Sequence, residues 1–531
     1  QVTTASIGGL VNDDSGAAMI AATVKATHLP SGSVYGTTTF DNGRYTIKNM
    51  RVGGPYQVEV SYIGYETQSV SDVYLELGQK EAINFTIREE GITTEEIVVT
   101  GSKDPILNGE RTGPSTSISS DQIASLPTIS RSASDYTRLN PMSAEGGSFA
   151  GRNDQFNNYS LDGAIFNNPF GLDAATPGGQ SNAQPISLDA IEQINVAIAP
   201  YDVTQSGFTG ASINSVSKSG TNEFHGTVFG YFRNADLTGG KVDGDEIFKG
   251  EPTQNQYGFS LGGPIVKNKV FFFANFEAEN RSDLGSLWVP SGGGNTVGNT
   301  SRVTQADMDL VSSLLRDRYG YETGASSGFI HDEDNIKGLF KLDFNIGSNH
   351  KLSATYNFLD AFNDNPAHPS AIGRRGPDLQ TLQFENSGYR INNELSQFRV
   401  ELKSFGNRFS NKFTAGLTQF RDFREAKSTP FPMINVSKDG IRYIVAGHEP
   451  FSINNRLDQD VIQLKNDFNI FSGNHSLTFG AAFERFNFDN SFNLGAYGGL
   501  VFAPDTPIEE FEDAVNIGVF DDAVSAARTA F

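Results

Sequence analysis

The fold is decided by residues 351–358, which read Lys-Leu-Ser-Ala-Thr-Tyr-Asn-Phe. The even-numbered residues are apolar and the odd-numbered residues are polar. A period of two is typical of a β-strand with one apolar and one polar face. The same alternation recurs at 398–403 and at 462–470. Residues 223–531 therefore predict a long series of antiparallel strands.

The connections between these strands favour a membrane barrel over a soluble sandwich. Both folds alternate, because a sandwich also has one buried and one wet face. Here short and long connections alternate, with tight turns at 267–269, 347–350, 406–408 and 472–474, and long excursions at about 234–253, 281–334, 362–389 and 425–459. Short turns on one side and long loops on the other are typical of outer-membrane β-barrels.

Counting gives about nine strands, and a bacterial single-chain barrel needs an even number to close. We predict them near 223–233, 254–266, 270–280, 335–346, 351–360, 391–405, 409–423, 460–471 and 475–489. Residues 507–527 look helical and are expected in an outer loop. The chain is thus expected to hold only the first part of a transmembrane antiparallel barrel.

Composition excludes several other classes of protein. The chain has no Cys, which excludes disulfides, thiolate metal sites and Cys nucleophiles. A net charge of −22 argues against a nucleic-acid partner and against docking on anionic lipid. No stretch approaches the roughly 18–20 apolar residues of a spanning helix, although a barrel does not need one. The start at Gln1 in strand-like sequence is interpreted as a mature N-terminus.

Three further zones precede the barrel. Residues 1–88 are short strands with turn signals every 8–12 residues, which predicts a small Ig/prealbumin-like β-sandwich. Residues 89–120 are acidic and hydroxylic, as in a flexible linker. Residues 121–222 predict a mixed α/β domain, and residues 223–531 form the barrel zone. The fold class is therefore mainly β.

Motifs in the first zone resemble the carboxypeptidase regulatory-like domain. They are the opening Gly9–Val11, the turn Pro30-Ser31-Gly32, the stretch Asp41–Tyr45 and Ile63-Gly64-Tyr65. The name of that domain implies no peptidase activity. We interpret it as a spacer or docking module.

Three motifs in the mixed domain occur in the order and at the spacing found in the plug domains of TonB-dependent receptors. They are Leu161-Asp162-Gly163, Leu188–Val196 and Gly210–Gly220. Ordered matches are more specific than any single motif. The family's usual Gly-Pro…Tyr-Gly turn is replaced by Ala199–Gly207. With its sandwich, the chain most resembles the Oar-like subgroup of TonB-dependent outer-membrane transporters. It resembles the SusC-like glycan importers less, which argues against a lidding SusD-type lipoprotein.

The resemblance implies a TonB box in the linker. A β-prone segment can pair with the sheet edge of a partner. The candidate TonB-binding residues are Glu95, Glu96, Ile97, Val98, Val99, Thr100 and Gly101. The resemblance also implies about 22 barrel strands in the whole protein, outer-membrane lipid around them, TonB as the partner, an extracellular substrate, and a sandwich and box in the periplasm.

Polar residues in the mixed domain are candidates for its ligand-facing surface. They are Arg152, Asn153, Asp154, Asn157 and Asn158. Hydrogen bonding between plug and barrel wall is an equally good explanation of them. His448-Glu449-Pro450 is not a zinc-protease motif, and no catalytic, cofactor or metal site is expected. Active transport of a peptide or other oligomer is favoured over a ferric siderophore, with a structural or adhesive surface protein as the alternative.

Overall fold

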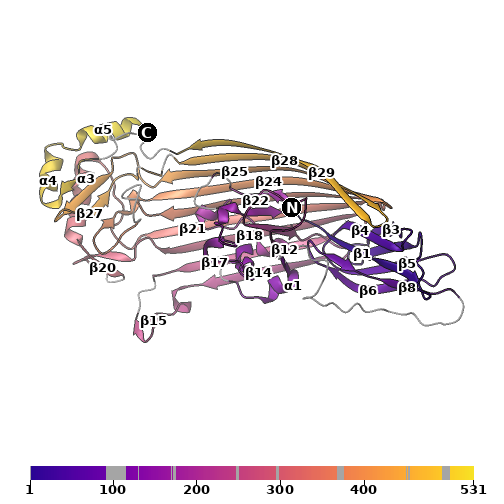
Figure 1. The fold of residues 1–531 in the computed structure, drawn as a ribbon. Coiled ribbons are helices and arrows are strands. Elements are labelled where there is room, and N and C mark those ends of the chain that lie inside the picture. The colour runs from indigo at the N-terminus through magenta and orange to yellow at the C-terminus, as the bar shows by residue number, and fades with distance from the viewer. Residues whose placement is uncertain are drawn as a thin grey trace.

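The computed structural model describes residues 2–90, 115–128, 131–168, 170, 175–246, 250–294, 298–367, 376–449, 451–452, 455–492 and 503–530. Three parts follow one another along the molecule in Figure 1. A small β-domain lies at one end, a long sheet with a second small domain against it occupies the middle, and a folded cap lies at the other end. No helix in the described part of the chain is long and apolar enough to cross a membrane.

The N-terminal domain is a sandwich of two sheets, as predicted. One sheet has the order β4-β1-β7, with β8 also paired to β1, and the other has the order β3-β2-β5-β6. The strands are β1 (Ala5–Asp13), β2 (Thr23–His28), β3 (Ser33–Thr38), β4 (Arg44–Met50), β5 (Gly53–Ser61), β6 (Gln68–Leu75), β7 (Lys80–Ala82) and β8 (Phe85–Ile87). Alternate apolar residues such as Ile7, Val24 and Val58 are fully buried between the sheets. The β3–β4 turn needs Gly43, because its φ is +72° and a Cβ there would lie 2.6 Å from the Val11 carbonyl oxygen.

The second domain is a five-stranded mixed sheet with two short helices, within the residues that the structure describes. Its strand order is β11-β10-β13-β12-β9, and β10 runs parallel to β13. The elements are β9 (Ser115–Ser119), α1 (Ser120–Ser125), α2 (Ala133–Thr137), β10 (Asn158–Leu161), β11 (Ala164–Ile165), β12 (Ile191–Ile198) and β13 (Ala211–Ser217). Ser119 begins α1 with a capping box, in which its hydroxyl accepts from the Gln122 N–H and the Gln122 side chain accepts in return. We call this domain the plug.

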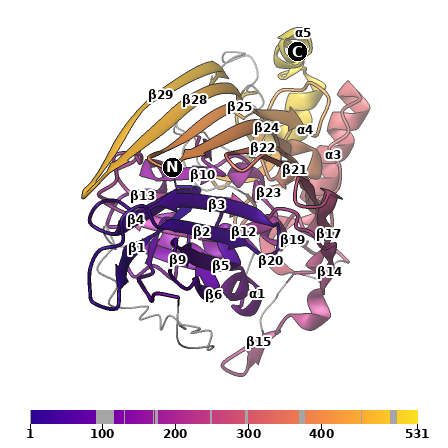
Figure 2. The same cartoon turned by 90° about the vertical axis from the view of Figure 1, so that its right-hand side faces the viewer.

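The long sheet is an antiparallel meander, and nine strands of it lie among the described residues. In order they are β14 (His225–Arg233), β17 (Thr253–Val266), β18 (Val270–Leu284), β21 (Ile330–Ile346), β22 (His350–Asn365), β24 (Tyr389–Gly406), β25 (Phe409–Ala426), β28 (Arg456–Ser472) and β29 (His475–Ser491). Each predicted strand is present. The sheet curls around the plug without closing, as the end-on view in Figure 2 shows. The fold class predicted from the sequence is therefore confirmed.

The two faces of this sheet have opposite chemistry. On the convex face large apolar side chains are exposed, among them Phe340, Tyr356, Phe398 and Ile462. On the concave face polar and charged side chains are buried, among them Lys337, Thr355, Gln397, Arg399 and Gln463. This is the reverse of a soluble protein, in which apolar side chains point into the core. It fits a wall with lipid outside and a filled polar lumen inside.

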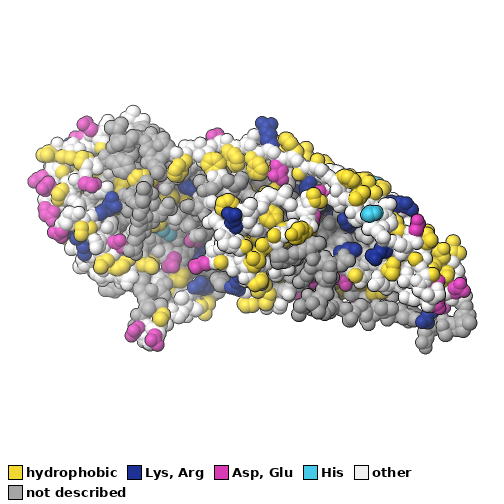
Figure 3. Space-filling model, viewed as in Figure 1, with side chains coloured by type: hydrophobic (Ala, Val, Ile, Leu, Met, Phe, Trp, Pro, Cys, Tyr) yellow, Lys and Arg dark blue, Asp and Glu magenta, His cyan; other side chains and the backbone are white. Residues whose placement is uncertain are grey.

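The long connections after β18 are not open loops but fold together into a cap. Its elements are β19 (Trp288–Ser291), β20 (Asn299–Thr304), α3 (Gln305–Tyr319), β23 (Leu382–Gln383), β26 (Ile434–Lys438), β27 (Ile441–Ala446), β30 (Thr506–Pro507), α4 (Ile508–Asn516) and α5 (Asp521–Ala530). The hairpin of β15 (Lys241–Val242) and β16 (Asp245–Glu246) projects separately from the same end of the sheet. Acidic side chains are prominent at the cap end of the molecule in Figure 3.

Candidate functional site

The site is the interface between the plug and the concave face of the sheet. Phe273 of β18 and Leu339 of β21 belong to the same hydrophobic cluster as the plug residues Ile118, Ile194 and Ile213. The plug therefore shares its core with the wall on one side. Elsewhere the interface is polar, because the lumen-facing side chains of the strands are hydrophilic.

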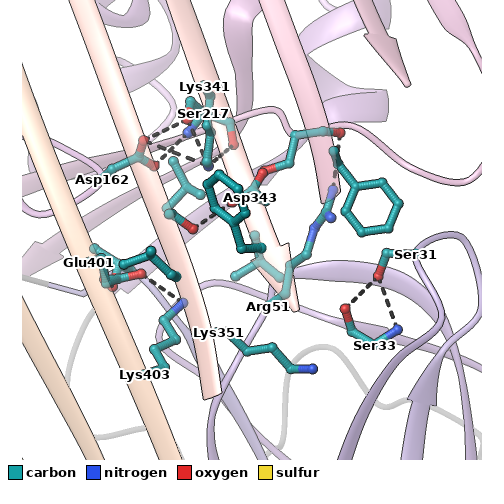
Figure 4. A pocket seen from close by; sticks show the side chains of 18 of the residues that line it. Ser31, Ser33, Arg51, Asp162, Ser217, Lys341, Asp343, Lys351, Glu401 and Lys403 are labelled. Carbon is teal, nitrogen blue, oxygen red and sulfur yellow. Dashed lines mark hydrogen bonds and ion pairs between the residues drawn. The ribbon is translucent and has the colours of Figure 1, made fainter. Parts of the chain in front are cut away.

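A buried ion pair joins the plug to the wall where the motif Leu161-Asp162-Gly163 turns between β10 and β11. Both Asp162 carboxylate oxygens accept hydrogen bonds from Ser217, one from its N–H at 2.9 Å and one from its hydroxyl at 2.6 Å. Lys341 of β21 donates to the Ser217 hydroxyl at 3.0 Å, and its Nζ lies 3.8 Å from Asp162 (Figure 4). Asp162 thus links two plug strands to one barrel strand.

A second buried cluster holds the plug a short distance along the wall. Lys337 of β21 lies 3.0 Å from Glu277 of β18, and neither side chain is more than 3% exposed. The other carboxylate oxygen of Glu277 accepts from the Ser187 hydroxyl of the plug at 2.5 Å. Because a buried carboxylate needs a partner for each oxygen, the plug serine completes the site.

Wall side chains also bind the backbone of the plug. Gln463 accepts from the Ile165 N–H, and Gln397 donates to the Ile165 carbonyl. Lys465 donates to the Thr204 carbonyl at 2.6 Å, and Asn357 donates to the Pro185 carbonyl. A net contribution of about 0.5–1.5 kcal/mol is typical of one such bond. Several such contacts hold the plug in register on the wall.

A cavity lies where the sandwich, the plug and the wall meet (Figure 4). Arg51 and Ser33 from the sandwich, Asp162 from the plug, and Lys351 and Glu401 from the wall line it. In the sandwich near this junction, His28 is buried and accepts or donates a hydrogen bond with Ser31. Burial, with Arg51 nearby, lowers the pKa of His28 to about 2, so it is neutral at physiological pH.

The structure divides the predicted substrate-binding residues into two groups. Arg152 and Asn153 are exposed and Asp154 is half-buried, and the Asn153 side chain accepts from the Gln155 N–H. Asn157 and Asn158 are buried. Asn157 accepts from the Ala211 N–H and donates to the Gly147 carbonyl, and Asn158 donates to the Ser206 carbonyl. These two side chains hold the plug's own segments together.

Sequence reasoning missed a segment of the plug that reaches the wall nearer the cap. Ser181 donates to Asn393 of β24 at 3.0 Å, and Asn182 donates to Glu333 of β21 at 3.1 Å. Gln180 accepts from Arg424 of β25 at 2.5 Å. The stretch around Gly178-Gly179 gives only a turn signal in sequence, so its contacts could not be anticipated.

Two other sequence features are the candidate TonB-binding segment and the His448-Glu449-Pro450 stretch. The candidate TonB-binding residues Glu95 to Gly101 lie outside the described residues. His448 and Glu449 are buried in the cap, where His448 is hydrogen-bonded to Ser428 and burial lowers its pKa to about 4. Within the described ranges, no group of His, Cys, Asp and Glu side chains is arranged to hold a metal ion.

Comparisons with known proteins agree with this architecture. A model of the carboxypeptidase regulatory-like domain matches residues 6–88, and a model of an outer membrane beta barrel domain matches residues 216–319. The TonB-dependent transporter Oar of Myxococcus xanthus is 29% identical over 237 residues, which cover 42% of this chain and 20% of Oar. The chain therefore spans about a fifth of the length of that curated relative.

Solved structures give weaker likenesses. The outer membrane transporter YddB from Escherichia coli has a TM-score of 0.47 at 13% identity, covering 71% of this chain and 48% of that chain. The siderophore receptor PirA from Pseudomonas aeruginosa has a TM-score of 0.43 at 13% identity, covering 71% of this chain and 49% of that chain.

The chain thus joins a domain that matches the carboxypeptidase regulatory-like domain to a segment that matches an outer membrane beta barrel domain. Its sequence is similar to that of a TonB-dependent transporter, Oar, as the plug motifs together with the sandwich predicted. The matched proteins are named as transporters and receptors rather than as enzymes.

Proposed function

We propose that this chain is part of a transporter that moves a substrate across the outer membrane with energy supplied through TonB. The observation that carries the proposal is the pairing of an apolar convex face with a polar concave face that a separate domain fills. A wall of this kind suits a membrane barrel, and the filling domain blocks its lumen. Passage of a substrate then requires the plug to move.

The orientation in the membrane that we propose is supported by the two ends of the sheet. The short turns and the sandwich lie at one end, and the long connections form the cap at the other. In bacterial barrels short turns are periplasmic and long loops are extracellular. We therefore assign the sandwich to the periplasm and the cap to the outside, with membrane lipid against Tyr356, Phe398 and their neighbours.

The TonB-binding segment in this proposal is Glu95 to Gly101. Its sequence contains Ile97-Val98-Val99-Thr100, which has high β-propensity. It stands between the sandwich and the first plug strand, β9, so force applied to it reaches the plug along the chain. TonB would hold it by strand addition, through main-chain hydrogen bonds.

Substitution of Val98 tests this assignment. A photo-crosslinker near Val98 should capture TonB in cells that contain the full-length protein. Val98→Pro removes one main-chain donor and should reduce capture by at least about tenfold, because a proline breaks the strand ladder. Val98→Ala keeps the donor and serves as the matched control. Equal capture by the two variants would show that TonB binds elsewhere.

Deletion of residues 95–101 separates transport from the alternative function. A structural or adhesive surface protein on the same barrel does not need this segment. Loss of substrate accumulation with normal surface exposure of the cap is expected for a transporter. An activity that survives the deletion would favour the adhesive function.

For the substrate we propose a peptide or another oligomer rather than a ferric siderophore. The cap helices carry acidic residues, namely Glu509, Glu510, Glu512 and Asp513 on α4 and Asp521 and Asp522 on α5. An acidic mouth repels anionic chelates, most strongly at low salt. Arg152, Asn153 and Asp154 of the plug are proposed to contact the substrate, with Asn157 and Asn158 supporting them from within.

A further inference from the structure

The sandwich is docked on the barrel rim through one face of its edge strand β3. The three odd-numbered residues of β3 are buried on the same face of the sheet as Val24 and Ala26, and at this edge of the sandwich each of them also contacts the wall. Ser33 donates to the Asn345 side chain, and Thr37 donates to the Asn407 carbonyl, each at 3.0 Å. Between them, the Tyr35 ring meets Phe405 edge-on at 5.3 Å. This is a specific contact, because polar and apolar groups are matched along the whole strand.

The contact continues along the strand ends and short turns at this end of the barrel sheet. Asn49 donates to the Ser410 hydroxyl at 3.2 Å, and Lys48 donates to Asn469 at 3.2 Å. Asn42 donates to Asn474 in the β28–β29 turn. The sandwich therefore rests on successive turns of the periplasmic rim, and Figure 2 shows it within the curve of the sheet.

The same domain is bonded to the plug. Gln193 of β12 accepts from the Leu77 N–H at 2.8 Å and donates to the Leu75 carbonyl at 3.2 Å, so one side chain satisfies two backbone groups of the sandwich. Asn195 of β12 donates to the Leu77 carbonyl at 3.3 Å. Arg51 of the sandwich donates to the carbonyls of Ser219 and Gly220 after β13.

The apolar core of the sandwich is continuous with both neighbours. Val216 of the plug and Phe405 of the wall belong to the same buried cluster as Ile7, Val24 and Val58. Undocking therefore exposes apolar surface as well as unpaired polar groups. A domain on a loose tether would not bury its partners' side chains in its own core.

We propose that the sandwich is a second stopper, which covers the periplasmic mouth beneath the plug and must undock before the plug can move. This inference rests on the proposed TonB-driven function. Gln193 and Asn195 lie on β12, an interior strand of the plug sheet, so the plug cannot leave toward the periplasm while these bonds hold. The sandwich thus blocks the lumen of the resting barrel more completely than the plug alone would.

The order of the chain fits release of the sandwich before the plug. The proposed TonB-binding segment follows the described end of the sandwich after residues 91–94 only, whereas residues 102–114 separate it from β9. The reach of a chain is about 3.3–3.6 Å per residue. When TonB pulls on the segment, the short connection to the sandwich is therefore fully extended before the longer connection to β9.

Thiol labelling tests the proposal, because the chain contains no native Cys. Thr37→Cys reports docking, since Thr37 is 5% exposed against the wall. Ala26→Cys, at 0% exposure inside the sandwich, reports unfolding, and the exposed Ser71→Cys reports reagent access. A charged maleimide is supplied to the periplasm of cells with and without energised TonB. We expect labelling of Thr37→Cys to rise several-fold with TonB, while Ala26→Cys and Ser71→Cys stay unchanged.

The outcomes are distinguishable. If Val98 crosslinks to TonB but Thr37→Cys does not respond, the sandwich is no stopper, although the transport proposal stands. An equal rise at Ala26→Cys would mean that the domain unfolds rather than undocks, and would also overturn the proposal.

A second measurement needs no TonB. In the purified full-length protein Gln193→Ala should raise the labelling rate of Thr37→Cys by about five- to tenfold, because two buried backbone groups lose their partner. Gln68→Ala on β6 is the matched truncation outside the interface and should have no effect. Equal rates in the two variants would show that Gln193 does not hold the sandwich on the plug.

Discussion

Neighbouring residues of one strand lie in different surroundings in this molecule, one against the plug and the next on the exposed convex face. Thr355 of β22 is 4% exposed on the side of the plug, whereas Tyr356 is 42% exposed on the convex face. Their Cα atoms are adjacent, and only the pleat of the strand separates their environments. The buried charged residues follow the same parity, since Lys337 and Lys341 of β21 both point to the plug. A shift of one residue in register would place those lysines on the apolar convex face.

Single cysteines at these two positions test the assignment of the faces. In native outer membranes a lipid-soluble maleimide should label Tyr356→Cys at least about tenfold faster than Thr355→Cys, because apolar reagents concentrate in the hydrocarbon layer. A charged, water-soluble maleimide should label neither position efficiently. Rapid labelling of Tyr356→Cys by the charged reagent would mean that the convex face is in water.

The cap shows how elements combine into a core that no single connection holds. α3 contributes Met308 and Val311, the segment of β26 and β27 contributes Ile434 and Ile444, and α4 contributes Phe511. Asp307 of α3 accepts from the Tyr443 hydroxyl at 2.7 Å, and Lys438 lies 3.3 Å from it. These contacts join connections that are separated by several barrel strands. The cap therefore behaves as one folded unit above the lumen.

Shortening a side chain in the cap core should destabilise the cap without affecting the barrel strands. Phe511 is fully buried, and Phe511→Ala should destabilise the cap by about 3–5 kcal/mol, as is typical of a large aromatic removed from a core. Ile517→Ala is the matched control, since Ile517 is 79% exposed. Hydrogen exchange in α3, α4 and β27 should rise for Phe511→Ala only. Unchanged exchange in that variant would mean that the connections fold independently.

At the scale of the whole molecule, the sandwich lies at the short-turn end of one curved sheet, the plug lies against its concave face, and the cap lies at its other end (Figure 1). The chain carries a net charge of −22. Charges on the concave face are largely paired, as in the Arg399–Glu401 pair at 2.6 Å, whereas the acidic residues of the cap helices α4 and α5 are exposed. Under the proposed function, these exposed carboxylates would repel anionic cargo at the cap end.

Iron supply tests the class of substrate that this charge favours. A siderophore receptor should become strongly more abundant when iron is scarce, whereas a peptide or oligomer transporter should change less than about twofold. Quantitative proteomics of outer membranes from iron-replete and iron-starved cells measures the difference. A known iron-regulated receptor in the same membranes provides the positive control. Strong induction, or a ferric chelate in the purified protein, would contradict the oligomer assignment.

Much of the architecture was accessible from the sequence. Hydrophobic alternation located all nine described strands of the sheet, and turn spacing identified the sandwich. The motifs around Asp162, Ile194 and Ile213 lie on neighbouring plug strands. These features are local, because a strand's period and a turn's residues are set within a few positions of each other. Local patterns of this kind can be recognised in a sequence before the fold is known.

What only the tertiary structure decided are the pairings across long separations. The Asp162–Lys341 ion pair, the docking of Thr37 on Asn407 and the shared core of the cap each join residues far apart in the chain. Asn157 and Asn158 could equally have faced a ligand, and they are buried because the segments at Gly147 and Ser206 fold over them. Composition and hydrophobic periodicity determine which face of an element is polar. They do not determine which other element packs against that face. That choice depends on how the whole chain packs.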